Sequence, residues 1–420
     1  MENRLVSIVV RTLLILILLT MVGAAAFAGG FGLATLIGRQ ATPVPPPSPT
    51  TASGQTQVQP PPPSPPPTTD EQTFQLFWEV WNIVQREYYG ELPDMQTVTY
   101  GAIQGMLETL DDPYTSFIEP SIAAIINEDA SGSFEGIGAY VRMGEDGRLE
   151  LVSIFEGSPA EAAGLRAGDR VVAVDGQSIV GYGIYEAIGL IRGPAGTPVT
   201  LTIERGSETP FDVTVVRARL TIPLVESEML DGNVAYIRLT EFSATATEQM
   251  EAALDELMAQ RPVGIVLDLR NNPGGWLDQA VEVADLFLGN GVVLIERFSD
   301  GTENVFRSYD GEVTEDIPLV VLVNGGTASA SEIVAGAIQD RGRGILIGEQ
   351  TFGKGSVQRP YTLSDGSELR VTIARWFTPN DVAIHGQGLT PDIVVPIPED
   401  TPAGQDPQLE RAVQYLLTGE

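Results

Sequence analysis

Three short apolar runs in the second half of the chain constrain its fold more than any other feature. They are GIVLDLR at 264–270, PLVVLVN at 318–324 and GILIGEQ at 344–350. A turn and a helix-like stretch follow each of the first two, WLDQAVEVADLFL after NNPGG and TASASEIVAGAIQD after a Gly-Gly pair. Buried strands that alternate with helices are typical of an α/β fold, which binds ligands where loops leave the carboxyl ends of its strands. The loops after the three runs should therefore lie together.

The loop after the third run, TFGKGSVQ at 351–358, contains Lys354, the only lysine of the 420 residues. All other basic residues except one histidine are arginines, whose pKa is too high for them to act as bases near neutral pH. The chain has no cysteine, and His385 is its only histidine, so the usual thiol nucleophile is missing and the usual general base is nearly so. Compositional bias that left one lysine on a solvated loop is the alternative explanation.

Composition excludes several classes of protein. The chain carries 56 Asp and Glu against 24 Lys and Arg, a net charge of -32, which would repel nucleic acid. Its length and its 43% of hydrophobic residues allow two or three packed domains. Without cysteine there is no disulfide and no thiolate metal site, and the scattered carboxylates lack metal-ligand spacing, so neither a metal nor a cofactor is predicted.

Residues 1–41 are predicted to form a transmembrane anchor. The uncharged run at 12–38 would extend about 40 Å as a helix, against a hydrocarbon core of about 30 Å. Arg4 and Arg11 precede the run, which favours an internal N-terminus and an exported catalytic body. The alternative is a signal peptide cleaved after an A-x-A-like site at 26–28, giving a secreted protein; the apolar run continues past that site. A buried core helix fits poorly beside the linker that follows.

An uncharged, proline-rich linker at 42–69 predicts a semi-rigid polyproline II spacer, although a proline-binding module could also recognise it. Apolar residues at helical spacing then predict a small helical N-terminal domain at 70–131. Within it LDDPYT, at 110–115, is predicted to be a helix stop and a turn.

Residues 132–220 alternate β-rich runs and turns with two short helical stretches, which predicts a compact β domain. The stretch GSPAEAAGLRAGDRVVAVDGQSI resembles a PDZ domain of the protease-associated kind. The resemblance implies that the backbone amides of the GIGA loop bind a peptide's C-terminal carboxylate while the peptide pairs with the adjacent strand. This loop comprises Gly136, Ile137, Gly138 and Ala139. A β domain without a peptide function is the alternative.

The stretch SASE, from Ser329 to Glu332, allows two interpretations. S-x-x-E is a capping box, in which serine and glutamate satisfy free amides at a helix start. Alternatively, a serine at a helix N-terminus exposes its oxygen beside amides that can stabilise an oxyanion. Such a nucleophile needs a base, and Lys354 could serve if burial lowers its pKa.

Three blocks together resemble the carboxy-terminal processing peptidases, the tail-specific serine proteases with a Ser/Lys dyad. They are LDLRNNPGG, GGTASASEIVAGAIQDRGRGILIGEQTFGKGSVQ and GQGLTPDIVVP. With the segment containing LDDPYT and the PDZ-like domain, the resemblance covers about 70–400. In this family a serine nucleophile precedes a lysine base by 25 positions, and a glutamine follows the lysine by four. Ser329, Lys354 and Gln358 match this spacing, whereas Ser331 does not.

The resemblance also implies an oxyanion hole formed by the backbone amides of Gly275 and Ala330. Gln358 would orient the lysine amine without adding a negative charge, which would raise its pKa. The residues next to Lys354 in sequence are uncharged and do not oppose its burial. His385 is the rival base, and a Ser/His arrangement predicts activity that survives loss of Lys354.

The predicted architecture is an α/β catalytic core at 221–400 with an inserted PDZ-like β domain, a small helical N-terminal domain, a preceding transmembrane helix and a C-terminal helix or tail at 401–420. The predicted function is a serine endopeptidase that cleaves protein substrates recognised near an apolar C-terminus, through an acyl-enzyme and without a cofactor. Its predicted partners are substrate C-termini, the membrane and further copies of itself. A non-catalytic PDZ-type peptide-binding scaffold is the alternative.

Overall fold

The computed structural model describes residues 69–311, 314–398, 401–402 and 404–420, which divide into two compact units between residues 105 and 106. The first unit contains helix α2 (Thr69–Glu87) and most of α3 (Met95–Glu108). The anchor predicted at 1–41 and nearly all of the linker lie outside the described residues. Within the described part of the chain, no helix has both the length and the apolar character needed to cross a membrane.

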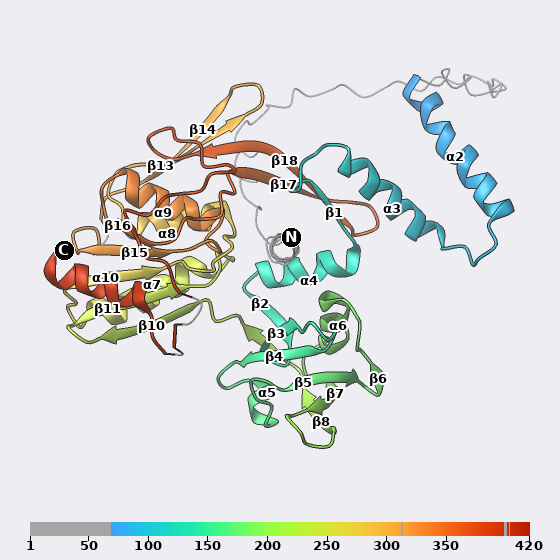
Figure 1. The fold of residues 1–420 in the computed structure, drawn as a ribbon, viewed down its shortest axis with the longest axis horizontal. Helices are drawn as coiled ribbons and strands as arrows, with labels where there is room; N and C mark the ends of the chain where they lie inside the picture. The colour runs from blue at the N-terminus through green and yellow to red at the C-terminus, as the bar shows by residue number, and fades with distance from the viewer. Residues whose placement is uncertain (1–68, 312–313, 399–400, 403) are drawn as a thin grey trace, which may run out of the picture. The chain divides into compact units, whose positions relative to one another are not determined.

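The second unit is built around a six-stranded sheet with the order β10-β11-β12-β15-β16-β19 (Figure 1). All neighbours from β11 to β19 are parallel, and β10 lies antiparallel at one edge. The predicted apolar runs form β12, β15 and β16, so the loops that follow them leave the same edge of the sheet, as the sequence predicts. The strands are Val225–Leu230, Val234–Leu239, Gly264–Asp268, Leu319–Val323, Ile345–Gly348 and Ile393–Val394.

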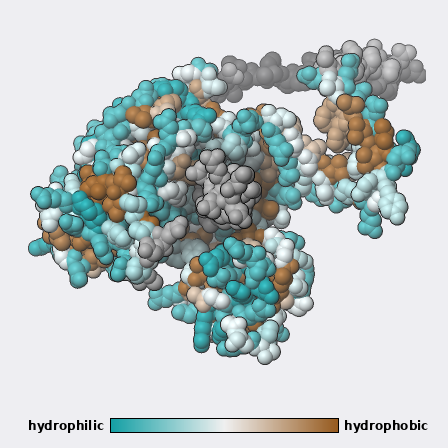
Figure 2. All heavy atoms as spheres, viewed as in Figure 1, coloured by the Kyte–Doolittle hydropathy of each residue, from teal (hydrophilic) through white to brown (hydrophobic). Residues whose placement is uncertain are grey.

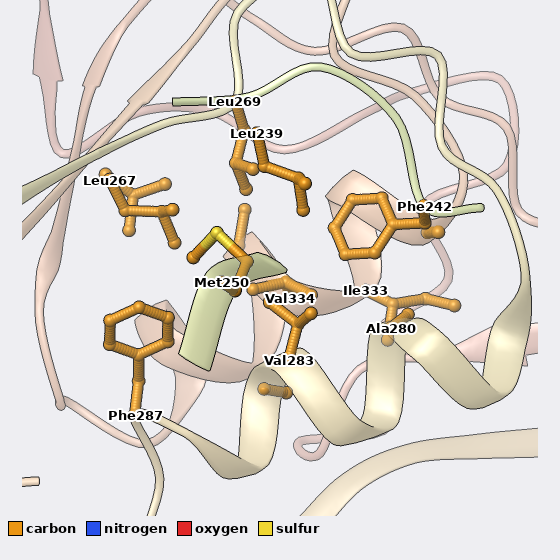
Figure 3. Close-up of a cluster of buried hydrophobic side chains, with 14 of the residues drawn as sticks. Leu239, Phe242, Met250, Leu267, Leu269, Ala280, Val283, Phe287, Ile333 and Val334 are labelled. Atoms are coloured by element: carbon orange, nitrogen blue, oxygen red, sulfur yellow. The ribbon is translucent and has the colours of Figure 1, made fainter. Parts of the chain in front are cut away.

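Helices cover both faces of this sheet. Helices α7 (Ala246–Met258), α8 (Leu277–Asp285) and α9 (Ala330–Asp340) contribute to one core, in which Phe287 and Val334 are fully buried (Figure 3). Helix α10 (Pro407–Thr418) contributes Ala412 and other apolar side chains to a second core with the opposite-facing strand residues. Strands enclosed on both sides need continuous apolar sequences, which is why β12 and β15 are buried at every position.

A second, antiparallel sheet adjoins this core and was not predicted from the sequence. Its long strand β18 (Glu368–Phe377) pairs with β1 (Ser116–Ile118), β17 (Ser356–Thr362) and β13 (Gly291–Phe298), and β13 also pairs with β14 (Glu303–Ser308). Strand β1 belongs to the segment predicted as a helical domain at 70–131, and α4 (Pro120–Ala130) follows it. The segment is therefore only partly helical, and its residues from 106 onward are part of the second unit.

The PDZ-like domain has its own sheet and core. The sheet order is β3-β4-β5-β7-β8, with β6 paired to β5, and both predicted short helices are present. Strand β2 (Ser133–Gly136) pairs with β9 (Ala218–Thr221), so the two ends of the inserted domain lie side by side. The other elements are β3 (Ala139–Met143), β4 (Leu149–Ile154), α5 (Pro159–Ala162), β5 (Arg170–Val174), β6 (Gln177–Ser178), α6 (Ile184–Ile191), β7 (Pro198–Glu204) and β8 (Phe211–Val216).

Candidate active site

Ser329 lies at the sharp turn between β15 and α9. Its φ of 56° is one that a residue with a Cβ rarely adopts, a form of strain that is concentrated at functional sites. The side chain is half-buried and remains accessible. Ser331, by contrast, is fully buried, and its Oγ donates to the carbonyl of Asn272 at 3.0 Å. Of these two serines, only Ser329 is positioned to reach a substrate.

The NNPGG loop packs directly against this turn. A Cβ added at Gly274 would lie 2.8 Å from both the Ala330 nitrogen and the Ser329 Cβ, so only glycine allows this approach. Asn272 holds the two loops together, because its carbonyl accepts from the Ala328 amide at 3.0 Å and its Oδ1 accepts from the Gly274 amide at 2.9 Å. The loop that carries Gly275 thus lies beside the amide of Ala330. The amides of Gly275 and Ala330 are the two donors predicted for an oxyanion hole.

Lys354 is buried, with 2% of its surface exposed, which is rare for a lysine. Its backbone is fixed on both sides: the amide donates to Glu332 Oε2 at 2.9 Å, and the carbonyl accepts from Trp376 Nε1 at 3.0 Å. Gly355 is needed next to it, because a Cβ there would lie 2.8 Å from the His385 nitrogen. The loop therefore holds the lysine inward rather than in solvent.

Burial lowers the pKa of Lys354 to about 7, and the positive charge of Arg370 acts in the same direction. The carboxylates of Glu332 and Asp112 oppose this effect. A substantial fraction of the amine is consequently neutral at neutral pH, which is the form that accepts a proton. The surroundings of Lys354 therefore favour the neutral form of its amine.

Glu332 does more than cap α9. Its fully buried carboxylate accepts from the amides of Ser329 at 2.9 Å and Lys354 at 2.9 Å, from the amide of Gly353 at 2.7 Å and from the hydroxyl of Thr351 at 2.5 Å. Burial nevertheless raises the pKa of Glu332, against the effect of these hydrogen bonds. The sequence showed the capping box but not that the same carboxylate joins the serine turn to the lysine loop.

The remaining predicted side chains are those of Gln358 and His385. Gln358 is buried on β17, and its Nε2 donates to Ser356 Oγ at 2.9 Å and to Thr372 Oγ1 at 3.2 Å. His385 is half-buried, and its buried Nδ1 has no hydrogen-bond partner among the described residues. Burial, helped by Arg375, lowers the pKa of His385. Histidine therefore remains near the site as a neutral ring.

Tyr114 was missed in the sequence, where LDDPYT appeared only as a turn. The Lys354 Nζ lies 5.3 Å from the centroid of the Tyr114 ring. The Tyr114 ring also contacts the His385 ring edge to face, with 5.9 Å between the ring centroids. No local pattern could reveal the contact between Tyr114 and Lys354, because the two residues are far apart in sequence. The pairing of β1 with β18 brings their segments together.

The predicted peptide-binding loop joins β2 to β3. Gly138 has a φ of 87°, and a Cβ there would collide with the side chain of Ser158. The carbonyls of Ile137 and Gly138 accept from the amides of Ala160 at 2.9 Å and Phe155 at 3.0 Å. Among the described strands, β3, which begins at Ala139, pairs only with β4, so its other edge has no strand partner there. The domain thus offers an edge to which an extended peptide could add.

Among the described residues, no group of three or more His, Asp or Glu side chains is arranged to hold a metal ion.

Comparison with known families identifies three parts of the chain. The profile described as "Peptidase family S41" matches residues 233–395, and the one described as "PDZ domain" matches residues 152–205. A third, "Activating protease CtpB N-terminal domain", matches residues 50–121. The order of the three agrees with an N-terminal segment, an inserted PDZ domain and a peptidase core.

Curated relatives align with most of the chain. A carboxy-terminal-processing protease of Bartonella bacilliformis is 42% identical over 75% of this chain and 74% of its own length. The carboxy-terminal processing protease CtpA of Bacillus subtilis is 38% identical over 79% and 71%, and a carboxyl-terminal-processing protease of Synechocystis sp. is 39% identical over 81% of both chains. On this similarity the chain belongs to peptidase family S41 and is a carboxy-terminal processing serine protease.

Proposed function

We propose that the chain is an endopeptidase in which Ser329 is the nucleophile and Lys354 the general base. Ser329 Oγ attacks the peptide carbonyl while its proton passes to the neutral Lys354 amine, and the tetrahedral oxyanion is stabilised by the amides of Gly275 and Ala330. The resulting lysine ammonium protonates the leaving amine, which leaves an acyl-enzyme. A water molecule, deprotonated by Lys354, then attacks the acyl group, and the lysine ammonium returns that proton to Ser329 Oγ as the acyl product leaves.

The observation that carries this proposal is the burial of the chain's only lysine beside the serine turn, in surroundings that lower the pKa of its amine to about 7. Glu332 supports the proposal because it bonds to the backbone amides of both reacting residues. Within this scheme Gln358 is assigned to orienting the Lys354 amine.

We further propose that the PDZ domain captures the C-terminus of a protein substrate. The amides of Gly136, Ile137, Gly138 and Ala139 would bind the terminal carboxylate, and the substrate would pair with the free edge of β3. The partly buried Ala139 and Val141, which pack on the domain core, favour an apolar terminal side chain. The proposal also includes the N-terminal membrane anchor, an exported catalytic body and a homo-oligomer.

The test is cleavage by the full chain of a fluorogenic peptide with an apolar C-terminus. Ser329→Ala and Lys354→Met should each lower kcat/KM by at least about a thousandfold. Peptide binding, measured by fluorescence anisotropy, should persist. The matched control is Ser227→Ala, which removes the hydroxyl of an exposed serine on β10. Amidation of the peptide terminus should weaken binding because the carboxylate is lost.

Other results would redirect the assignment. Turnover by Lys354→Met that disappears in His385→Asn would make histidine the base. Binding without turnover in the unmodified protein would favour the non-catalytic scaffold.

A further inference from the structure

The turn at 110–115 is fixed to the strands of the catalytic site. Strand β1, directly after this turn, pairs with β18 through Ser116 and Arg370. Thr115 Oγ1 accepts from the Thr372 amide at 3.1 Å and donates to Asp112 Oδ2 at 2.7 Å. Since β18 also pairs with β17, which begins just after Lys354, the turn is held in register with the lysine.

Within this turn Tyr114 is the residue that meets the lysine. Its amide donates to Asp112 Oδ1 at 3.1 Å, which fixes the backbone, and its half-buried ring lies 5.3 Å from the Lys354 Nζ. At this distance the contact is between an amine and an aromatic face rather than a hydrogen bond. The edge-to-face contact with His385 limits the freedom of the ring.

The charges around Lys354 do not by themselves explain a neutral amine. Glu332 on α9 and Asp112 in the turn favour the ammonium, and Arg370 on β18 opposes it. His385 meets the Tyr114 ring edge to face, and the positive charge of Arg375 acts on both Tyr114 and His385. Burial is the largest influence on the amine. The neutral form therefore depends on the side chains that keep water away from it.

We propose that Tyr114 is a positioning residue for the catalytic base, whose ring covers the Lys354 amine and excludes water from it in the resting enzyme. This inference rests on the proposed function. Tyr114 lies outside the S41 profile match at 233–395. The inference gives this residue a direct part in keeping the Lys354 amine neutral. The segment before the PDZ domain would thus complete the active site.

The single lysine allows a direct test in the full chain. Protein labelled with ¹³C at lysine Cε carries one labelled side chain, so one NMR resonance reports the pKa of Lys354. The acid limb of the pH profile of kcat/KM for peptide cleavage reports the pKa of the same group independently. Four variants of Tyr114 are compared with the unmodified chain.

Tyr114→Ala should admit water and raise the pKa of Lys354 by about one unit or more, and the acid limb should move equally. Activity lost at pH 7 should then be recovered at higher pH. Tyr114→Gln should shift the pKa in the same direction, so the test does not depend on the folding of one variant. Tyr114→Phe keeps the ring and should stay within about 0.3 unit, whereas Tyr114→Leu keeps an apolar cover without the aromatic face and should not raise the pKa.

An unchanged pKa of Lys354 in Tyr114→Ala, with kcat/KM reduced equally at every pH, would overturn the inference. It would assign Tyr114 to packing or substrate binding. A rise in Tyr114→Leu as large as in Tyr114→Ala would do the same. Lys354→Met separates this failure from that of the proposed function. If that variant is inactive while the Tyr114 variants leave the pKa unmoved, only the inference about Tyr114 fails; if it is active, the Ser/Lys mechanism fails.

Discussion

At the scale of single residues, the position of Lys354 is unfavourable for stability. The amine has a pKa of 10.5 in its ordinary state and about 7 in the folded protein. Between these values the unfolded chain binds the additional proton, so this residue makes stability rise with pH across that window and fall as pH decreases toward 7. At about 1.4 kcal/mol for each pH unit, the full loss approaches about 5 kcal/mol.

Lys354→Met should therefore stabilise the protein while it abolishes cleavage. We expect the free energy of unfolding to rise by a few kcal/mol at pH 7, and the gain to shrink strongly at pH 10, where the amine is neutral in the folded state and the unfolded chain has begun to lose its proton. Urea unfolding at the two pH values measures this. Ser329→Ala, which retains the amine, should show no such pH-dependent gain. An equal gain at both pH values would mean that the lowered pKa of the buried amine is not its cause.

At the scale of elements, α10 is fixed to the catalytic edge of the sheet. Asp406 caps the helix by accepting from the Leu409 amide at 3.0 Å, and its carboxylate also binds both terminal nitrogens of Arg270. Arg270 lies two residues beyond the end of β12 and precedes the NNPGG loop, and it also binds Asp268. One carboxylate thus joins the C-terminal helix to the base of the loop that carries Gly275.

Asp406→Ala should lower the free energy of unfolding by about 2–3 kcal/mol, because it removes a cap and leaves the mostly buried Arg270 with one fewer partner. Asp406→Asn, which keeps a capping oxygen, should lose less. Glu226→Ala serves as the control, because its 3.3 Å pair with Arg238 is exposed and should change stability by less than about 0.5 kcal/mol. Urea unfolding compares the three. A loss no greater than that of the control would mean that α10 is held by its apolar face alone.

The sequence predicted these elements unevenly. β12, β15 and β16 could be recognised because a strand covered on both faces must be continuously apolar. β18 escaped prediction, since its burial is mixed along its length and its partners come from three separate parts of the chain. The same limit applies to the site. The candidates Ser329, Lys354 and Gln358 come from local sequence blocks, whereas the contacts of Glu332 and Tyr114 exist only in the folded chain.

At the scale of the whole molecule, α2 carries an apolar surface that the described residues leave exposed. Phe74 is 59% exposed and Trp78 is 47% exposed, and they lie one helical turn apart. In Figure 2, hydrophobic side chains gather over this helix. An exposed apolar patch of this kind commonly marks an interface, and a second copy is the partner for which the chain supplies the same surface.

We predict that α2 mediates self-association. Sedimentation equilibrium of the full chain in a mild detergent should detect an oligomer, and a Phe74→Ser, Trp78→Gln double variant should shift it to the monomer. Val216→Ser with Val305→Ser, which changes exposed apolar residues on β8 and β14, is the control and should leave the oligomer unchanged. A monomer at every concentration in the unmodified chain would refute the prediction.

The contacts of Glu332 bear on when proteolytic activity can appear during folding. A protease that became active before its folding was complete would cut its own emerging chain and its neighbours. In this protein one buried carboxylate, that of Glu332, bonds both to the Ser329 turn and to the Lys354 loop. If Ser329 and Lys354 act as proposed, a molecule in which Glu332 is displaced would therefore lose the support of nucleophile and base together.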